Sequence, residues 1–362
     1  MSPRIIAFYL PQFHAIPEND EWWGKDFTDW VNVRKARPLF NGHQQPRIPL
    51  NENYYDLSKV ETLQWQTEIA NKYGVYGFCF YHYWFNGKML LEKPAEMLLA
   101  DKSIALHFCF SWANEPWART WDGKAKQVLM PQSYGGRDDW EKHFHYLLPF
   151  FQDERYIKED GQPMFLIYKT SSIPCAKEMM NLWNELARKN GFKGIHFVET
   201  LRDGHIDKRD LPIKARVEFE PARTNRQQHP IVLNYKRIRR VAIHTTNRVL
   251  HKKHLLNKPF PFMNVAECSI NNHSPEGTYG GVFVGWDNSP RRSLASTIVL
   301  PPTKEEFKSY LEAKIKVTKE RYHTNYVFVN AWNEWAEGTV LEPEERTGYA
   351  YLEVIKELNE SL

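Results

Sequence analysis

The chain has 362 residues, of which 14% are aromatic, and carries a formal net charge of +4. This length fits one large domain, because α/β barrels of such size are routine single domains. The charge is too small to indicate a nucleic-acid partner, since nucleic-acid binders concentrate basic residues on one face, and we expect none. The 13 tryptophans and 18 tyrosines suit stacking on flat ligand faces as well as core filling.

The N-terminal sequence and the cysteines predict a cytoplasmic protein. The apolar run 5–10 is too short for the core of a signal peptide and lacks a small-residue cleavage site. No segment reaches the ~18 apolar residues of a membrane span. The cysteines lack CxxC spacing and form neither a zinc motif nor a disulfide framework; they are Cys79, Cys109, Cys175 and Cys268. Cys79 and Cys109 lie in apolar runs and are interpreted as buried thiols.

Short apolar runs alternate with helical patterns along the whole chain. Eight runs are candidate strands: 4–9, 75–82, 104–111, 163–168, 194–199, 215–220, 281–286 and 326–332. Alternation of strands and helices indicates a parallel sheet, and eight strands over this length favour a closed (β/α)8 TIM barrel. No G-x-G-x-x-G follows a strand, which disfavours a doubly wound dinucleotide fold. We expect one domain over 1–362 with loop insertions at about 15–57 and 221–279.

The clearest helix is predicted over 58–73. Ser58 is a candidate N-cap, Glu61 completes an S-x-x-E capping box, and Gly74 ends the segment. Further helices are expected over 138–151, 176–190, 304–322 and 348–358.

Two carboxylates follow the last strand. Glu334 and Glu337 are three residues apart, with Asn333 and Trp335 beside them. In one helical turn their Cβ atoms would lie roughly 5–6 Å apart, which overlaps the carboxyl separation of about 5–5.5 Å in retaining glycosidases. Acids at this spacing also occur on solvated helix starts, so the neighbouring tryptophans carry the active-site interpretation.

A TIM barrel places its chemistry at the C-terminal ends of its strands. Polar and aromatic residues follow each candidate strand here, and we expect many of them to line one pocket with the two acids. A lone buried Tyr or His is more often a core residue, so the interpretation rests on finding such residues after all eight candidate strands. The candidate substrate-binding residues are Tyr9, Gln12, His14, Trp30, Tyr81, His82, Trp112, Asn114, Glu115, Trp286, Asn333 and Trp335.

The two long insertions contain aromatic and basic residues that allow more than one interpretation. The loop 15–57 shows no elements of its own, and Trp22, Trp23 and Trp30 in it either wall a groove or pin the loop to the barrel. The insertion 221–279 contains two basic segments, 236–240 and 251–254. These are either a solvated face or a contact for a membrane surface, a lipid-linked glycan or another anionic ligand.

Four stretches resemble a known family: Ala7–Val33, Pro38–Pro49, Tyr54–Leu57 and Asn330–Pro343. They are similar to the WbsX-type proteins of bacterial surface-polysaccharide loci, which are related to glycoside hydrolase family 99, and the resemblance spans essentially the whole chain. It implies a (β/α)8 barrel acting on α-linked, mannose-like glycans. It also implies that Glu337 is the general acid/base and that Glu334 deprotonates the substrate's 2-hydroxyl. That hydroxyl then attacks C1 and forms a 1,2-anhydro sugar with overall retention.

These roles set opposite electrostatic requirements. As proton donor, Glu337 needs a raised pKa, which the flanking Trp335 and the like charge of Glu334 would supply. Glu334 must stay ionised, which a hydrogen bond from Asn333 or a nearby tyrosine would favour.

Three function classes remain open. A retaining glycoside hydrolase or transglycosylase is favoured by the paired acids and by the absence of a Gly-rich phosphate loop. A glycosyltransferase in surface polysaccharide (O-antigen) biosynthesis is favoured by the missing signal peptide and the basic 236–254 segment. A non-catalytic glycan-binding barrel is disfavoured by the two acids. The expected partner is an oligosaccharide or polysaccharide; the sugar, the linkage and the oligomeric state are left open.

No metal or cofactor is expected. His82, His107 and His196 are isolated on strands, and His143 and His145 lack the spacing of zinc ligands on a helix.

Overall fold

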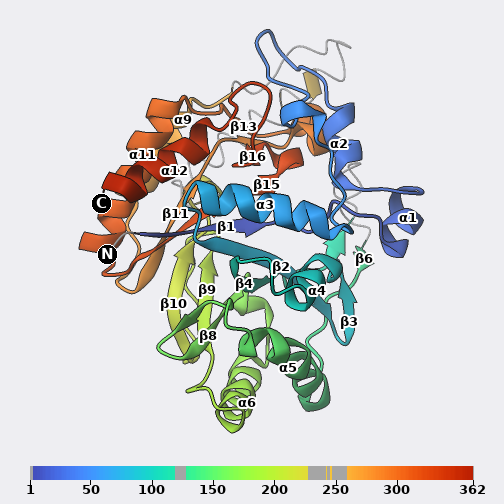
Figure 1. The fold of residues 1–362 in the computed structure, drawn as a ribbon, viewed down its shortest axis with the longest axis vertical. Coiled ribbons are helices and arrows are strands. Elements are labelled where there is room, and N and C mark those ends of the chain that lie inside the picture. Colours follow the sequence, from blue (N-terminus) through green and yellow to red (C-terminus); the bar gives the residue numbers. More distant parts are fainter. Residues whose placement is uncertain (1–2, 119–127, 227–241, 243–244, 247–258, 362) are drawn as a thin grey trace.

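The computed structural model describes residues 3–118, 128–226, 242, 245–246 and 259–361. Eight strands pair in parallel in chain order, and β1 pairs with both β2 and β14, so the sheet closes (Figure 1). The strands are β1 (Arg4–Tyr9), β2 (Gly77–Phe85), β4 (His107–Trp112), β8 (Gln162–Ile167), β9 (His196–Leu201), β10 (Ile213–Glu218), β11 (Thr278–Phe283) and β14 (Tyr326–Asn330). The predicted (β/α)8 barrel is confirmed.

The barrel strands are apolar on both faces, as expected for parallel strands that helices cover from outside. Every residue of β2 is buried, for example. Cys79 and Cys109 face each other in the β2–β4 register and are buried, as predicted.

The seventh strand begins three residues earlier than predicted. The added residues are Thr278, Tyr279 and Gly280, and Gly281 follows them in β11. A Cβ on Gly280 would lie 2.1 Å from Oγ1 of Thr318, and one on Gly281 would lie 2.0 Å from the carbonyl oxygen of Glu218. These glycines therefore allow close packing of a helix and of β10 on the strand.

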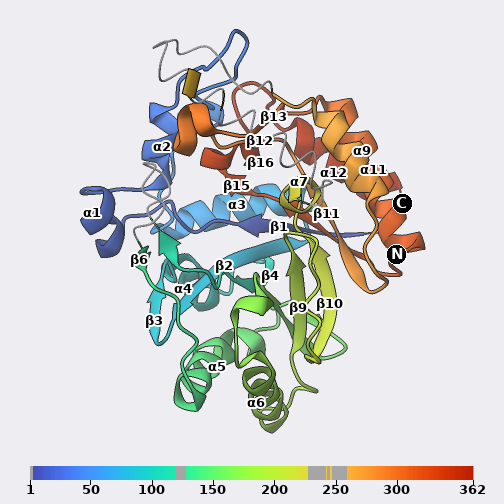
Figure 2. The ribbon, with the colours of Figure 1, turned by 180° about the vertical axis from the view of Figure 1, so that it is seen from behind.

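Helices surround the barrel (Figures 1 and 2). They are α3 (Val60–Lys72), α4 (Lys93–Ala100), α5 (Arg137–Gln152), α6 (Ala176–Lys189), α7 (Ala222–Arg226), α9 (Phe262–Asn271), α10 (Ser289–Arg292), α11 (Lys304–Glu320) and α12 (Ala350–Ser361). In both views α11 and α12 lie together on one flank, and α5 and α6 lie together on another. None of the described helices combines the length and apolarity needed to cross a bilayer.

The capping box predicted at Ser58 is wrong. Helix α3 begins at Val60, and its N-cap is Lys59, whose side chain makes no capping bond. The backbone N–H of Ser58 instead donates to Oδ1 of Asp56 at 2.8 Å, forming a turn before the helix. A complete capping box occurs at α11, between Thr303 and Glu306.

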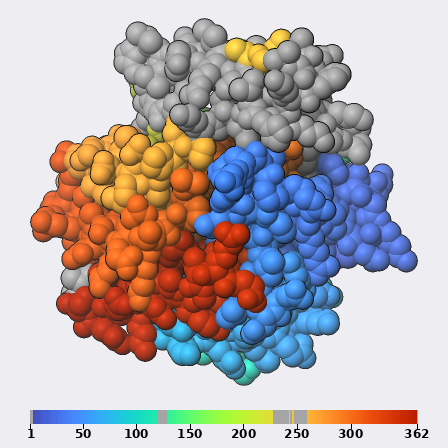
Figure 3. Space-filling model, turned by 90° about the horizontal axis from the view of Figure 1, so that it is seen from above, coloured from blue at the N-terminus to red at the C-terminus, as the bar shows by residue number. Residues whose placement is uncertain are grey.

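The first long loop does contain secondary structure, contrary to the prediction. It holds α1 (Pro17–Trp23), α2 (Asp29–Lys35) and the 3-10 turn η1 (Leu50–Glu52). Trp30 packs on Phe13 and Trp335, with ring centroids 4.5 and 5.6 Å apart, and so pins α2 to the barrel. Figure 3 shows this N-terminal region, in blue, directly beside the orange and red C-terminal segments.

Short strands and 3-10 turns lie in the connections between the barrel elements. They are β3 (Lys88–Leu90), β5 (Trp117–Ala118), β6 (Val128–Met130), β7 (Lys158–Glu159), β12 (Trp286–Asp287), β13 (Ile298–Val299), β15 (Asn333–Glu334), β16 (Thr339–Val340), η2 (Thr170–Ser172), η3 (Ser293–Ala295) and η4 (Trp335–Glu337). The basic segments 236–240 and 251–254 lie outside the described residues.

Candidate active site

The two acids lie on a small hairpin at the end of β14. Strands β15 and β16 pair antiparallel, and the 3-10 turn η4 joins them. Residues i and i+3 eclipse in a 3-10 turn, which brings Glu334 and Glu337 to one side without the helical turn that was expected. Gly338 closes the turn with φ of 64°, a left-handed conformation that glycine adopts at little cost.

The amide of Asn333 fastens this hairpin to the end of β1. Its Oδ1 accepts from the backbone N–H of Leu10 at 2.7 Å, and its Nδ2 donates to the carbonyl of Leu10 at 3.0 Å and to the hydroxyl of Tyr55 at 3.3 Å. Asn333 is fully buried. The expectation that Asn333 hydrogen-bonds Glu334 or a sugar is therefore corrected, because its amide is engaged in holding the backbone.

Arg291 of α10 connects both acids to the first loop. Its Nη1 donates to Oε1 of Glu337 at 2.8 Å, and its Nη2 lies 3.7 Å from Oε2 of Glu334. Nη2 also donates to Oδ2 of Asp29 at 2.6 Å. One guanidinium thus faces three carboxylates, so it partly neutralises a cluster that would otherwise repel itself.

Burial raises the pKa of both catalytic candidates. Desolvation raises the pKa of Glu334 well above its usual value and the charge of Glu337 adds to this, while Arg291 lowers it. Desolvation also raises the pKa of Glu337, which Arg291 lowers. The expectation that the surroundings favour the ionised form of Glu334 is corrected, because the pKa of this group is raised as well.

A pocket of about 260 Å³ opens beside the acids. Trp23 of α1 and Trp117 of β5 give it aromatic walls, and Tyr83 packs against Trp117 with ring centroids 5.1 Å apart. The lining residues are Leu10, Gln12, Trp23, Tyr83, Pro116, Trp117, Ala118, Leu129, Arg291 and Glu334. Oε2 of Glu334 has no hydrogen-bond partner among the described residues. The pocket thus combines aromatic rings, an amide and a carboxylate oxygen that can still accept a hydrogen bond.

Several of the predicted residues lie at this site. Gln12 lines the pocket. Tyr81 lies close enough to Glu334 and Glu337 for their charges to raise its pKa, after the larger effect of burial. Trp30 forms a layer behind the site, because it packs on Trp335 and its indole N–H donates to the carbonyl of Tyr55 at 2.8 Å.

Other predicted residues face away, which corrects the expectation of one shared pocket. Successive strand residues point to opposite faces, so Tyr81 and Tyr83 point to the barrel interior while His82 contacts α5. Nε2 of His82 lies 2.8 Å from Nε2 of His143, and burial lowers the pKa of His82 to about 3. The indole N–H of Trp112 donates to the carbonyl of Trp84 at 3.2 Å.

The remaining predicted residues serve the scaffold. Asn114 accepts from the backbone N–H of Lys169 at 2.8 Å, and Tyr9 donates to Gln66 at 2.7 Å. His14 is buried, and desolvation lowers its pKa to about 4. Glu115 forms ion pairs with Lys169 and Arg202, Trp286 belongs to the β12–β13 pair, and Trp335 donates to Glu342 at 2.7 Å. The indole N–H of Trp335 is thus directed to Glu342.

Sequence reasoning missed four residues of the site region. Asp29 and Arg291 form the ion-pair cluster, Tyr83 lines the pocket, and Glu342 binds the back of the hairpin. The signals were present: Asp29 precedes Trp30 in the first motif, and Arg291 follows the seventh strand's Trp286-Asp287. Nothing in the sequence pairs them across 262 positions. Among the residues that the structure describes, no cluster of three or more His, Cys, Asp or Glu side chains is arranged to hold a metal.

Comparison with known proteins adds family information. A protein-family profile described as "Glycosyltransferase WbsX" matches residues 5–355. Two uncharacterized proteins named WxcX, from two strains of Xanthomonas campestris pv. campestris, are 38% identical over 99% of this chain. The match covers 50% of each of these proteins, so the chain spans about half their length.

Solved structures share the fold at low sequence identity. A glycoside hydrolase family 99 endo-α-mannosidase from Bacteroides thetaiotaomicron, in complex with bis-tris propane, is similar with a TM-score of 0.56. Its identity is 15%, over 99% of this chain and 96% of that one. A glycoside hydrolase-like protein is similar with a TM-score of 0.58 and 12% identity, over 99% of this chain and 94% of that one. At these identities the likeness establishes the barrel fold.

Proposed function

Because the chain belongs to the WbsX glycosyltransferase family, we propose that it is a glycan-active enzyme that cleaves or transfers α-linked, mannose-like sugars with retention. The observation that carries the proposal is the pair Glu334 and Glu337, which Arg291 holds beside a pocket with aromatic walls. Such a pair can exchange one proton between a sugar hydroxyl and a leaving oxygen.

In the first step Glu334 removes the proton of the substrate's 2-hydroxyl, and that oxygen attacks C1. The bond from C1 to the leaving oxygen breaks, and Glu337 gives its proton to the leaving group. This forms a 1,2-anhydro sugar. In the second step water or another sugar hydroxyl gives its proton to Glu337 and attacks C1, the bond between C1 and the 2-oxygen breaks, and the 2-oxygen recovers its proton from Glu334. Retention follows from the two inversions.

The raised pKa of Glu334 fits this sequence, because a bound sugar would favour the ionised form of that group. A 2-hydroxyl that donates to Oε2 of Glu334 would favour the ionised form of that group, because a hydrogen bond to a carboxylate lowers its pKa. The new charge on Glu334 would then raise the pKa of Glu337, since the two acids titrate as a pair. Binding of the substrate therefore prepares Glu337 to act as the acid.

The family description favours a second candidate, a glycosyltransferase that uses an activated sugar donor. In both candidates a glycan hydroxyl can be the acceptor, but the leaving groups differ. A hydrolase or transglycosylase releases a sugar, whereas a transferase releases a phosphorylated group.

The test is incubation of the chain with α-linked manno-oligosaccharides, with and without nucleotide sugars, followed by NMR of the first anomer formed. Release of the α-anomer without a nucleotide sugar supports retaining cleavage. Product that forms only with a nucleotide sugar supports the transferase. If neither mixture changes while the protein is folded, the enzyme proposal fails in favour of glycan binding without turnover.

A further inference from the structure

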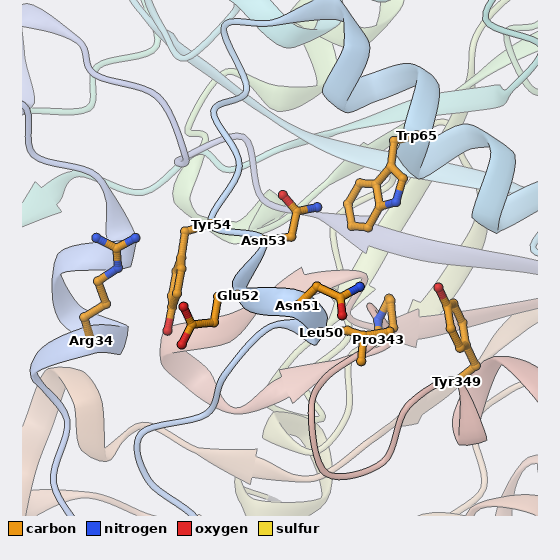
Figure 4. Close-up of a pocket in the computed structure, with 9 residues that line it drawn as sticks. All are labelled: Arg34, Leu50, Asn51, Glu52, Asn53, Tyr54, Trp65, Pro343 and Tyr349. Atoms are coloured by element: carbon orange, nitrogen blue, oxygen red, sulfur yellow. The ribbon is translucent and has the colours of Figure 1, made fainter.

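A second cavity, of about 570 Å³, opens on the outside of the barrel between η1, α3 and the segment before α12. Figure 4 shows Tyr54 on one side of it and Trp65 and Tyr349 on the other, with the side chains of Asn51 and Asn53 between them. It shares no lining residue with the pocket beside the catalytic acids. We call it the outer groove.

The three aromatic rings of the outer groove are partly exposed, and each packs against a neighbouring side chain. Tyr349 stacks on Tyr73 at 5.3 Å, and Trp65 packs on Tyr55 at 5.9 Å. The guanidinium of Arg34 lies 3.9 Å from the centre of the Tyr54 ring. Rings fixed in this way lose little conformational freedom when a ligand stacks on them.

The backbone of the groove is strained at Glu52. Asn51 and Glu52 both have left-handed backbones, with φ of 57° and 53°, a conformation that asparagine adopts fairly readily and glutamate seldom does. Hydrogen bonds hold them there: Leu50 donates to the carbonyl of Pro343 at 3.0 Å, and the N–H of Asn51 donates to Glu345 at 2.6 Å. Strain that the surroundings maintain often marks a binding site.

The polar groups of the groove suit a ligand with many hydroxyls. Between the described residues, no hydrogen bond uses the side-chain amides of Asn51 or Asn53, and each amide offers donors and an acceptor. Arg34 and Glu52 carry opposite charges at one edge. Their charges offset each other, so the groove favours a neutral ligand over an anion or a cation.

We propose that the outer groove binds a neutral oligosaccharide segment through ring stacking and amide hydrogen bonds. Tyr54 packs edge-on against Trp30 at 5.1 Å, and Trp30 packs on Trp335 of the catalytic hairpin. One aromatic layer thus separates the two sites. The inference rests on the proposed function, because a glycan polymer held in the groove would raise the effective concentration of its other units near the acids.

The test is binding of α-mannotriose, maltotriose and cellotriose to the whole chain, measured by saturation-transfer NMR and tryptophan fluorescence up to about 10 mM. We expect Trp65→Ala to weaken binding of at least one probe roughly fivefold, because a stacking ring is lost. Asn51→Gly should also weaken it, and glycine fits the left-handed backbone, so this variant folds. Tyr76→Ala, at a half-buried tyrosine that stacks on His107, is the matched control.

Each outcome decides the inference. Weaker binding in Trp65→Ala and Asn51→Gly, with binding kept in Tyr76→Ala, supports it. Absence of binding of all three probes, or equal binding by every variant, overturns it. Turnover of a short substrate should be unchanged in Trp65→Ala, since the groove lies outside the catalytic pocket. If neither the unaltered protein nor any variant turns over a substrate while binding in the groove persists, the proposed function fails but the inference about the outer groove is kept.

Discussion

Arg291 donates a hydrogen bond of 2.8 Å to Glu337 through Nη1. This bond makes the two proposed catalytic carboxylates unequal, because Glu334 has only a longer contact of 3.7 Å with the same guanidinium. Asp29 competes for Arg291 from the other side at 2.6 Å. The proton affinity of the pair thus also depends on residues outside the segment 333–338.

Removing the charge of Arg291 and removing the charge of Asp29 should shift the pH–rate profile in opposite directions. The charge of Arg291 lowers the pKa of both acids, and the charge of Asp29 raises it. Arg291→Met should therefore move both limbs of the kcat/KM profile to higher pH, and Asp29→Asn should move them to lower pH. The measurement is kcat/KM against pH between about 4 and 9.

Arg291→Lys is the control for this pair, because it keeps the charge but loses the forked geometry. Its profile should stay near that of the unaltered protein even if its rate falls. Parallel shifts of Arg291→Met and Asp29→Asn in the same direction would contradict the electrostatic explanation.

Gly338 should tolerate no side chain. Its φ is 64°, and a Cβ would lie 2.8 Å from both Cβ and N of Asp287. Asp287 cannot easily yield, because His43 and Gln45 bind its carboxylate at 2.7 and 2.6 Å. Gly338→Ala should displace the turn that carries Glu337 and lower kcat at least about tenfold, since small misplacements of catalytic groups are costly.

Gly277→Ala provides the matched control for Gly338→Ala. Gly277 has φ of 75° and nothing within 4 Å of its added Cβ, so alanine there carries only the cost of a left-handed backbone, roughly 1–2 kcal/mol. Its melting temperature should fall by a few degrees while kcat is retained. Equal loss of activity in both variants would show that the contact with Asp287 is unimportant.

The barrel could be predicted from the sequence because its signals are local. Runs such as 326–332 show their strand character within a few residues, and all eight predicted strands overlap observed ones. Errors arose where a distant neighbour decides the outcome. The seventh strand was predicted from position 281, but β11 begins at Thr278, and its Gly281 packs against the carbonyl oxygen of Glu218.

The site was predicted less completely for the same reason. The spacing of Glu334 and Glu337 is a local pattern, whereas the contact between Asp29 and Arg291 depends on closure of the barrel. The alternation rule within β2 would have assigned His82 to the outer face, opposite to Tyr81. Applying it to each strand end would have removed the residues that face the helices.

Glu342 should link stability to pH. Its Oε2 accepts from Tyr55 at 2.8 Å and from Trp335 at 2.7 Å, and its Oε1 accepts from Gln66 at 2.6 Å. Burial raises its pKa to about 7, above the unfolded value of about 4.3. The folded state therefore binds an extra proton between these values, so stability falls as pH rises through this window, by up to roughly 3 kcal/mol.

Glu342→Gln should flatten this dependence. The substitution should also lower the free energy of unfolding at pH 5 by about 1–3 kcal/mol. The new side-chain NH2 group would face the amide donor of Gln66, so two donors would meet without an acceptor. Urea unfolding at several pH values between about 5 and 8 measures both effects. Glu320→Gln, on the surface of α11, should leave the slope unchanged, and an unchanged slope in Glu342→Gln would rule out Glu342 as its source.

The two acids should differ in their dependence on the leaving group. Glu337→Gln cannot protonate the leaving oxygen, so hydrolysis of an unactivated α-glycoside should fall by about 10²–10⁴-fold. An activated aryl α-glycoside needs no such proton and should be partly spared. Glu334→Gln should slow both substrates, because attack of the 2-oxygen on C1 is lost in each. The measurement is kcat/KM of each variant on the two substrates. The reverse pattern, with the aryl glycoside spared only in Glu334→Gln, would exchange the roles of the two acids. Full activity of both variants would place the chemistry elsewhere.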